Sequence, residues 1–171
     1  EQWKETVERV GNTPQHLVGL LMATSEGDQT PGPDQLVRVG TVARIHHAVT
    51  ERGRIQFIAE GIQRFEITQW STIERPLVAE VRYPISQSED STEIRASAQA
   101  LINKIRELIP LNPLYKENVR AFLERFNPQD ASPLVDFAAA LTSSSGDELQ
   151  DILETIPLLR RMEKVMVLVQ N

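Results

Sequence analysis

Residues 36–67 read LVRVGTVARIHHAVTERGRIQFIAEGIQRFEI, and this stretch decides the fold. Over residues 37–46, apolar and polar side chains alternate with a period of two, as in a strand with one buried face. The polar run TERG then predicts a turn, in which Gly53 is free to adopt a positive φ. Alternation resumes over residues 55–59 and is interrupted at Gly61, where a bulge or bend is expected. The stretch therefore predicts a long, bent β-hairpin.

Two further strands and one helix are expected around this hairpin. Residues 16–24 (HLVGLLMAT) are apolar on both faces, as in a strand that is covered on both sides. Residues 77–85 alternate again and predict another half-buried strand. Residues 25–34 (SEGDQTPGPD) contain two glycines and two prolines, so a loop is expected there. Residues 1–10 predict a short helix, and residues 1–86 as a whole are interpreted as a β-rich lobe. The apolar stripe of that helix comprises Trp3, Val7 and Val10.

From residue 87 onward, apolar side chains recur at the helical period, and five helices are expected. The first is expected to start at Asp90, whose side chain would form a capping box with Glu93. Ser145 and Glu148 predict the same arrangement at the start of the fourth helix. Pro110 is expected to end the first helix. The second helix is expected to start at Asn112-Pro113 and to end at Asn127-Pro128.

The third and fifth helices have the most informative apolar patterns. The third contains LVDFAAAL, which is apolar nearly all round, so a central position is expected. The fifth is expected to begin at Pro157, with an apolar stripe whose spacing of four, three and four resembles a coiled coil. That stripe comprises Leu158, Met162, Val165 and Val169.

Composition and charge narrow the possible functions. With 40% hydrophobic and 25% charged residues, the sequence is that of an ordinary globular protein. A net charge of −6 argues against nucleic acid as the main partner, because phosphate binding needs a concentrated basic surface. The absence of cysteine excludes disulfides, thiolate metal sites and thiol catalysis, and it agrees with a cytoplasmic location. No apolar run approaches the about 20 residues that a membrane-spanning helix needs.

No catalytic, cofactor-binding or metal-binding residues are predicted. The sequence lacks the motifs G-x-x-x-x-G-K-[ST], G-x-G-x-x-G, G-x-S-x-G and H-E-x-x-H. His46 and His47 are neighbours on a strand and should point to opposite faces, so they cannot bind one metal together. One of the two is expected to be exposed and the other to lie within the sheet. A cluster of three acidic residues could suggest a calcium site, but its spacing lacks the alternate-position ligands of a calcium loop. It comprises Glu89, Asp90 and Glu93.

Two polar groups in the helical half also have plain interpretations. Residues 143–145 are three serines that, together with Lys164, could suggest a Ser–Lys nucleophile, but a linker followed by an N-cap is the favoured interpretation. Arg160 and Arg161 lie close to Lys164 and predict a small basic face, either solvated or paired with Glu163.

Two segments carry a resemblance to a known family. VGTVARI at 39–45 and AEGIQRFEI at 59–67 resemble the N-terminal domain of the Lon family of ATP-dependent proteases, in which V-G-T-V-A-x-I precedes E-G-x-x-R by a similar interval. The matching positions there are Gly40, Gly61 and Arg64. Residues 149–170 resemble the closing helices of the family domain. The matching positions in that segment are Leu149, Leu153, Glu154 and Arg161. The opening L-P-x-L-P-L strand of the family is absent, so the sheet is expected to lack one strand.

The resemblance implies an α+β fold: a PUA-like pseudo-barrel β lobe over residues 1–86 and a helical bundle over 87–171 that leads toward a coiled-coil helix. It also implies capture of unfolded or damaged protein substrates and assistance in hexamer assembly. If the first strand is absent, an exposed sheet edge could pair with an extended peptide or with a second copy, so weak self-association is expected. No catalytic residue, cofactor or metal is implied for this chain. In the parent protein the resemblance implies ATP, magnesium and a Ser–Lys protease dyad outside these residues, and it assigns no individual residue to substrate contact.

A second interpretation is a stand-alone binding module, either Lon-type or a PUA-like RNA binder. RNA recognition needs basic or aromatic side chains gathered on one surface. The β-rich half offers Trp70, Tyr83, two phenylalanines and scattered arginines. We therefore favour the interpretation as a protein-binding domain.

Overall fold

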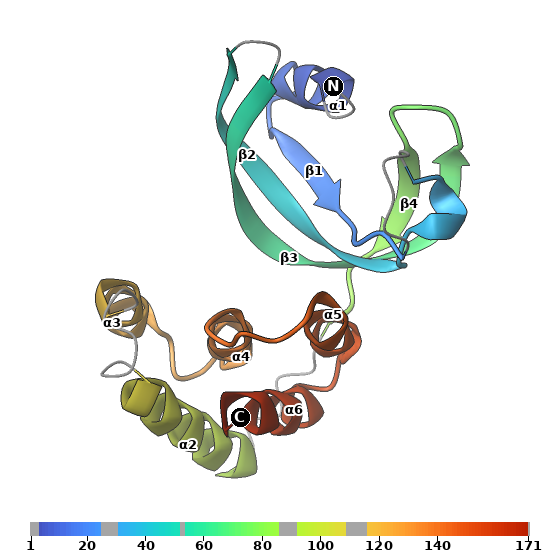
Figure 1. Ribbon diagram of the computed structural model, residues 1–171. Coiled ribbons are helices and arrows are strands. Elements are labelled where there is room, and N and C mark those ends of the chain that lie inside the picture. Colours follow the sequence, from blue (N-terminus) through green and yellow to red (C-terminus); the bar gives the residue numbers. More distant parts are fainter. Residues whose placement is uncertain (1–3, 25–30, 52–53, 86–91, 109–115, 171) are drawn as a thin grey trace. The chain divides into compact units, whose positions relative to one another are not determined.

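The computed structural model describes residues 4–24, 31–51, 54–85, 92–108 and 116–170, coloured along the chain in Figure 1. The chain divides into two compact units, Glu1–Pro84 and Ile85–Asn171. The first contains an antiparallel sheet and the second contains helices, so the fold is α+β, as expected.

A four-stranded antiparallel sheet with the order β1-β2-β3-β4 forms the first unit. β2 (Val39–Glu51) and β3 (Arg54–Thr72) form the long hairpin, which curves visibly in Figure 1. β1 (Leu17–Leu20) pairs with β2, and β4 (Val78–Arg82) pairs with β3. The bent hairpin predicted from residues 36–67 is therefore confirmed, although its turn at 52–53 lies outside the described residues.

Two register shifts accompany the curvature of the hairpin. In the first, residues 61–63 of β3 lie opposite only Val42 and Ala43 of β2, so β3 carries one extra residue. This is the bulge that the glycine at 61 predicted, since an extra residue on one strand bends the pair. The second shift lies between His46 and Val49.

The two edge strands are shorter and more exposed than the sequence predicts. The apolar run at 16–24 forms a strand over only four residues, and Leu17 in it is exposed, so the expected cover on both faces is wrong. The run at 77–85 is a strand only from Val78 to Arg82, and Tyr83 beyond it is half exposed. Edge strands are hydrogen-bonded on one side only, so an apolar sequence by itself neither lengthens nor covers them.

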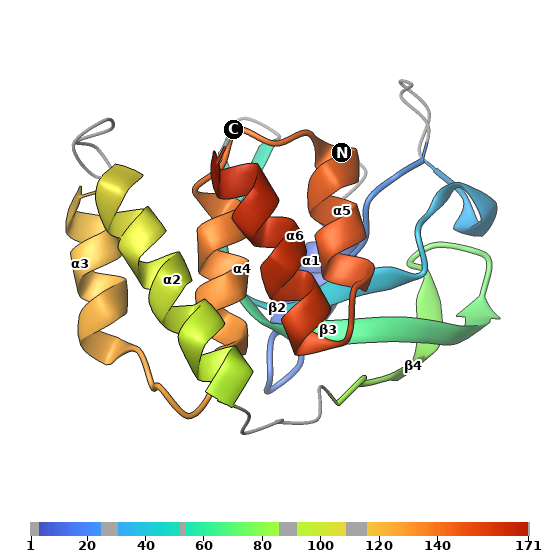
Figure 2. The ribbon, with the colours of Figure 1, turned by 90° about the horizontal axis from the view of Figure 1, so that it is seen from below.

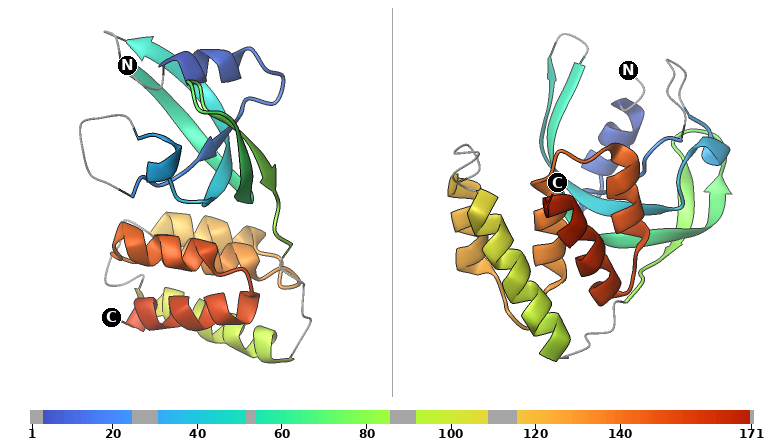
Figure 3. Two further views of the ribbon diagram at one scale, coloured as in Figure 1. Left: turned by 90° about the vertical axis from the view of Figure 1, so that its right-hand side faces the viewer. Right: turned by 60° about the horizontal axis from the view of Figure 1, so that its bottom comes forward.

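Two small cores support the sheet. α1 (Lys4–Gly11) lies beside the hairpin in both panels of Figure 3, and its two valines pack against β2. That core comprises Val7, Val10 and Ile45, with Val18, Ile55 and Phe57 partly buried around them. The other comprises Val42, Phe65 and Ile67, with Leu21, Trp70 and Ala79 around them. Trp3 lies outside the described residues. Residues 25–30 of the expected loop at 25–34 lie outside the described residues, and a 3-10 helix, η1 (Pro33–Gln35), begins near the end of that loop.

Five helices make up the described part of the second unit (Figure 2): α2 (Thr92–Leu108), α3 (Lys116–Arg125), α4 (Ser132–Ala140), α5 (Gly146–Glu154) and α6 (Leu158–Gln170). α4 contacts α2, α5 and α6, which confirms its predicted central position. The predicted apolar stripe of α6 is buried in the hydrophobic core of this second unit. The helix signals expected at Asp90, Pro110 and Asn112-Pro113 lie outside the described residues.

Candidate functional surfaces

Gly40 of the first family motif lies where three strands meet. It pairs with Phe65 of β3, and a Cβ atom at this position would overlap the carbonyl oxygen of Leu20 in β1. The same Cβ would lie 2.7 Å from Leu21 Cδ2 and 2.9 Å from Phe65 Cζ. Glycine therefore allows β1 and the phenylalanine ring to approach β2 closely, and the role of Gly40 is structural.

The other two motif positions in the sheet unit lie in β3. Gly61 is exposed at the bulge, and a Cβ there would meet only Thr41 Cγ2, at 3.4 Å. Arg64 is half-buried and pairs in register with Thr41. The glycine at 61 thus coincides with the bulge, and no close approach of two strands requires glycine there.

Arg161 is buried in the core of the helical unit, with a relative exposure of 1%. Its Nη2 donates a hydrogen bond of 2.7 Å to Ser132 Oγ, and its Nε lies 4.0 Å from Asp136 Oδ1. The predicted basic face is therefore wrong: Arg160 is exposed, whereas Arg161 points into the unit. Its spacing of three residues from Leu158 and four from Val165, both buried, was the local signal for this burial.

The remaining motif positions, Leu149, Leu153 and Glu154, lie in α5. Glu154 Oε1 accepts a hydrogen bond of 2.8 Å from Gln150 Nε2 within α5, and Leu153 is half-buried. The predicted pairing with Glu163 is not what Lys164 forms. Its Nζ instead lies 2.6 Å and 2.7 Å from the two carboxylate oxygens of Asp151. The amine is thus held by a carboxylate, in an ion pair that links α5 and α6.

The capping box at the start of α5 is confirmed. Ser145 Oγ accepts from the backbone N–H of Glu148, and the Glu148 carboxylate accepts from the backbone N–H of Ser145 at 2.8 Å. Two hydrogen bonds to its carboxylate lower the pKa of Glu148 below the usual value of 4.5. The larger effect comes from the Ser145 backbone N–H and the smaller from the Ser145 hydroxyl. The last of the three serines therefore serves as an N-cap.

The histidines do not form a metal site. His46 Nε2 lies 2.9 Å from Glu60 Oε2 on the sheet surface, and His47 is exposed with a φ of 47°. The expectation of one exposed histidine and one within the sheet is confirmed: His46 is half-buried and pairs with Ile58 in the ladder, whereas the exposed His47 lies in the register shift that follows. Among the described residues, no group of three His, Cys, Asp or Glu side chains could hold a metal ion. Glu89 and Asp90 lie outside those residues.

A shallow groove of about 320 Å³ lies between α3 and α4. Its floor includes the ring of Phe122, which stacks on Phe137 of α4 with centroids 4.0 Å apart. Its lining includes one carboxylate, that of Asp130, but no hydroxyl, imidazole or amine side chain with which this carboxylate could act in nucleophilic catalysis. The lining comprises Ala121, Phe122, Arg125, Phe126, Asn127, Asp130 and Pro133. None of the described helices is both long and apolar enough to cross a bilayer.

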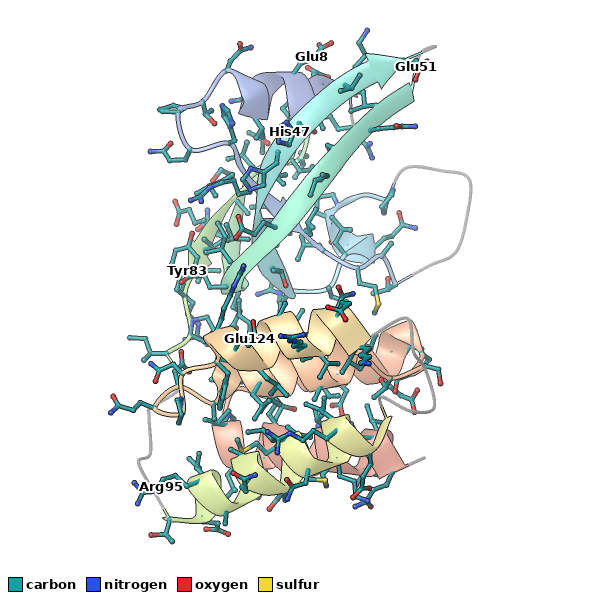
Figure 4. All side chains as sticks on the ribbon, turned by 90° about the vertical axis from the view of Figure 1, so that its left-hand side faces the viewer. Glu8, His47, Glu51, Tyr83, Arg95 and Glu124 are labelled. Carbon is teal, nitrogen blue, oxygen red and sulfur yellow. The ribbon has the colours of Figure 1, made fainter. Side chains whose placement is uncertain are left out.

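Exposed apolar side chains are concentrated on the sheet unit, a feature that the sequence analysis did not single out. They lie on the strands and on the segments next to them. They are Leu17, Val49, Ile58, Ile62, Ile73, Val78, Val81 and Tyr83. Figure 4 shows the side chains around the hairpin, with His47 and Glu51 labelled on β2. Surfaces of this kind bind other macromolecules more often than they carry out chemistry.

Residues 1–171 match the family described as the ATP-dependent protease La (LON) substrate-binding domain. The chain belongs to this family. It is 37% identical over 170 residues to Lon protease 2 of Hydrogenovibrio crunogenus, a match that covers 99% of this chain and 19% of that protein. It is 36% identical over 173 residues to Lon protease of Magnetococcus marinus, covering 98% of this chain and 21% of that protein. This member of the Lon family thus spans about a fifth of the length of these relatives.

Solved structures show the same fold. The N-terminal domain of a Mycobacterium avium complex Lon protease matches with a TM-score of 0.72 at 17% identity, covering 100% of this chain and 86% of that one. A Lon N-terminal domain protein from Xanthomonas campestris matches with a TM-score of 0.53 at 17% identity, covering 90% of each chain. The fold thus agrees with the resemblance to the Lon family, which the family match and the sequence relatives confirm.

Proposed function

We propose that this chain recognises unfolded or damaged protein substrates for an ATP-dependent Lon protease in the cytoplasm. The observation that carries the proposal is the family match over residues 1–171 to a substrate-binding domain. The chain spans only about a fifth of its relatives that are named Lon protease. In the parent protein, other segments would supply ATP and magnesium binding and a Ser–Lys dyad that cleaves peptide bonds.

The two units would share this task. We assign residues 1–86, which include the sheet unit, to a PUA-like pseudo-barrel that lacks one strand, and residues 87–171 to a helical bundle that leads toward a coiled coil. Exposed aliphatic side chains on the sheet unit, such as Ile58, support a role in binding. Unfolded chains present apolar side chains without a fixed shape, so an exposed apolar surface can bind many of them weakly.

Assistance in hexamer assembly is the second part of the proposal. β1 and β4 are the edges of the sheet, and an edge strand can pair with a strand of another copy. We expect weak self-association of this chain by light scattering at high protein concentration. A molar mass that stays at the monomer value across the whole concentration series would contradict this part.

Binding of an unfolded protein tests the main proposal. The ligand is a small disulfide-bonded protein, fluorescently labelled and permanently unfolded by reduction and carboxymethylation, with its native form as the matched control. We expect the unfolded form to bind with micromolar or weaker affinity and the native form to bind negligibly, as measured by fluorescence anisotropy. Equal binding of both forms, or binding of neither, would overturn the proposal.

The rival function is a stand-alone module that binds protein or RNA. Titration of a labelled single-stranded RNA separates the two, and we expect negligible RNA binding because the chain has a net charge of −6. Reading the gene beyond Asn171 adds a second test: a phosphate-loop motif followed by a protease serine and lysine supports the Lon parent. An early stop codon would favour the stand-alone module, and ATP hydrolysis or casein digestion by this chain alone would contradict the proposal.

A further inference from the structure

The distal half of the β2–β3 hairpin has one covered face and one bare face. Ile45, Ile55 and Phe57 belong to the core that α1 completes. Successive side chains on a strand point to opposite faces. The neighbours of Ile45 along β2, and of Ile55 and Phe57 along β3, therefore point away from α1. The bare face is therefore formed by the alternate residues of the same two strands.

Strand register places six side chains together on this bare face, beside the exposed Gln56. Arg44 of β2 pairs with Leu17 of β1 on one side and with Glu60 of β3 on the other, while His46 pairs with Ile58. Paired residues in antiparallel strands project from the same face. Val49 pairs with Gln56, which lies two positions before Ile58 in β3. Val49 therefore extends the face toward the hairpin tip. We call this set the Ile58 face: Leu17, Arg44, His46, Val49, Ile58 and Glu60.

The aliphatic members of the Ile58 face are open to solvent. Ile58 is 62% exposed, Val49 is 58% exposed and Leu17 is 37% exposed. Isolated exposed apolar residues are common on proteins, but three on adjacent strands of one face form a surface that a partner can cover. Each would lose unfavourable contact with water when covered by an apolar side chain.

The two charged side chains of this face, Glu60 and Arg44, differ in whether they have a partner. The Glu60 carboxylate is engaged by the His46 ring, with 2.9 Å between Oε2 and Nε2. Arg44 is exposed, and within the described part of the chain its guanidinium forms no hydrogen bond or ion pair. Among the residues that the structure describes, the face therefore offers Arg44 as one free cation bordered by aliphatic side chains. Its complement is a carboxylate bordered by aliphatic side chains, since a guanidinium binds a carboxylate through paired hydrogen bonds.

We propose that the Ile58 face is a docking surface for extended polypeptide segments in which aliphatic residues flank an aspartate or glutamate. This inference rests on the proposed function and names the surface and the substrate class for it. The aliphatic side chains of the segment cover Ile58 and Val49, and its carboxylate pairs with Arg44. A single arginine is too little charge for a nucleic acid or an anionic membrane, which need clusters of basic residues.

A peptide titration on the full 171-residue chain tests the assignment. The probe is a fluorescein-labelled peptide that alternates leucine with glutamate, and two matched peptides replace either every glutamate by lysine or every leucine by serine. We expect only the leucine–glutamate peptide to bind. Ile58→Ser should weaken its binding about tenfold, because one aliphatic contact is lost. Arg44→Gln should weaken binding severalfold at low salt and less at high salt, since the ionic contact is screened.

Control variants separate this surface from general effects. Ile73→Ser removes an isoleucine that is 78% exposed but lies just beyond the far end of β3, and Arg9→Gln removes an exposed cation on α1. Both should bind the peptide as the wild type does, and unchanged tryptophan fluorescence would show that all four variants are folded. Equal loss in the control variants, or wild-type binding by Ile58→Ser and Arg44→Gln, would overturn the assignment.

The same variants distinguish the two proposals. If the wild type binds the carboxymethylated protein but Ile58→Ser and Arg44→Gln bind it equally well, the Ile58 face is refuted and the substrate-recognition function stands. If the wild type binds neither the carboxymethylated protein nor any peptide, both proposals fail. Equal binding of the glutamate and lysine peptides would refute the role of Arg44.

Discussion

Arg161 of α6 donates a hydrogen bond of 2.7 Å from Nη2 to Ser132 Oγ at the start of α4, and the arginine is only 1% exposed. The Asp136 carboxylate lies 4.0 Å from its Nε and supplies a nearby countercharge. A buried guanidinium must keep its acceptors, because any donor left without one bears the full cost of lost hydration. The contact therefore fixes α6 against α4.

Replacing this acceptor should destabilise the helical unit. We expect Ser132→Ala to lower the free energy of unfolding by about 1–3 kcal/mol, because the guanidinium loses a buried partner. Helix unfolding is followed by far-ultraviolet circular dichroism in urea, since both tryptophans, Trp3 and Trp70, lie in the sheet unit. The control Ser143→Ala alters an exposed serine and should change stability by less than about 0.5 kcal/mol. Equal stability of both variants would contradict this role of Ser132.

Gly40 is expected to tolerate no side chain. Gly40→Ala places a methyl group against the Leu20 carbonyl and 2.9 Å from Phe65 Cζ, so strands β1 and β2 must separate. We expect a loss of about 1–3 kcal/mol in unfolding free energy, as for overpacked cores. The measurement is tryptophan fluorescence in urea, because Trp70 packs in the same cluster as Phe65.

Gly61→Ala is the matched control for this substitution. Its new Cβ would meet only Thr41 Cγ2, at an ordinary contact distance of 3.4 Å. Its effect should stay within about 0.5 kcal/mol. A larger loss at Gly61 than at Gly40 would show that the close approach of the strands is not what requires glycine at position 40.

Local patterns predicted the elements whose determinants lie within a few residues of one another. The hairpin followed from alternation, and the capping box of α5 followed from Ser145 and Glu148, three positions apart. The helical stripe of α6 was equally readable, because Met162 and Val165 recur at the spacing of one helix face and are both buried. In each case the signal and the structure that it predicts involve the same short segment.

The errors and omissions arose where partners lie far apart in the chain. The burial of Arg161 depends on Ser132, which is 29 positions away, and the partner of His46 is Glu60, which is 14 positions away. The Ile58 face was missed for the same reason. Alternation alone leaves Ile58 among the outward positions of its strand, but only the pairing with β2 brings it next to Arg44 and Leu17.

The capping box of α5 predicts a pH dependence of stability. The Ser145 backbone N–H and then its hydroxyl lower the pKa of Glu148 below 4.5 in the folded chain. An acid whose pKa is lower when folded stabilises the fold above its unfolded pKa, and this contribution disappears as the pH falls through the folded value. We therefore expect the helical unit to lose stability as the pH is lowered below about 4.5, with part of this loss due to Glu148.

Glu148→Gln should flatten this part of the pH profile, because an uncharged amide cannot titrate. The free energy of unfolding is measured by circular dichroism in urea at a series of pH values below neutrality. The same substitution at the exposed Glu163 of α6 serves as the control and should keep the wild-type slope. Identical profiles for the wild type and Glu148→Gln would show that the capping carboxylate does not contribute.

The ion pair between Lys164 of α6 and Asp151 of α5 is expected to contribute little to stability despite its short distances. Nζ lies 2.7 Å and 2.6 Å from the two carboxylate oxygens, but the side chains are 40% and 63% exposed, so water weakens their attraction. A double-mutant cycle with Lys164→Met and Asp151→Asn should give a coupling energy of about 0.2–1 kcal/mol. In about 1 M salt the coupling should fall toward zero, because the charges are screened. A coupling that is larger and independent of salt would contradict this, since it would require the pair to be shielded from solvent and to fix α5 against α6 as Arg161 fixes α6 against α4.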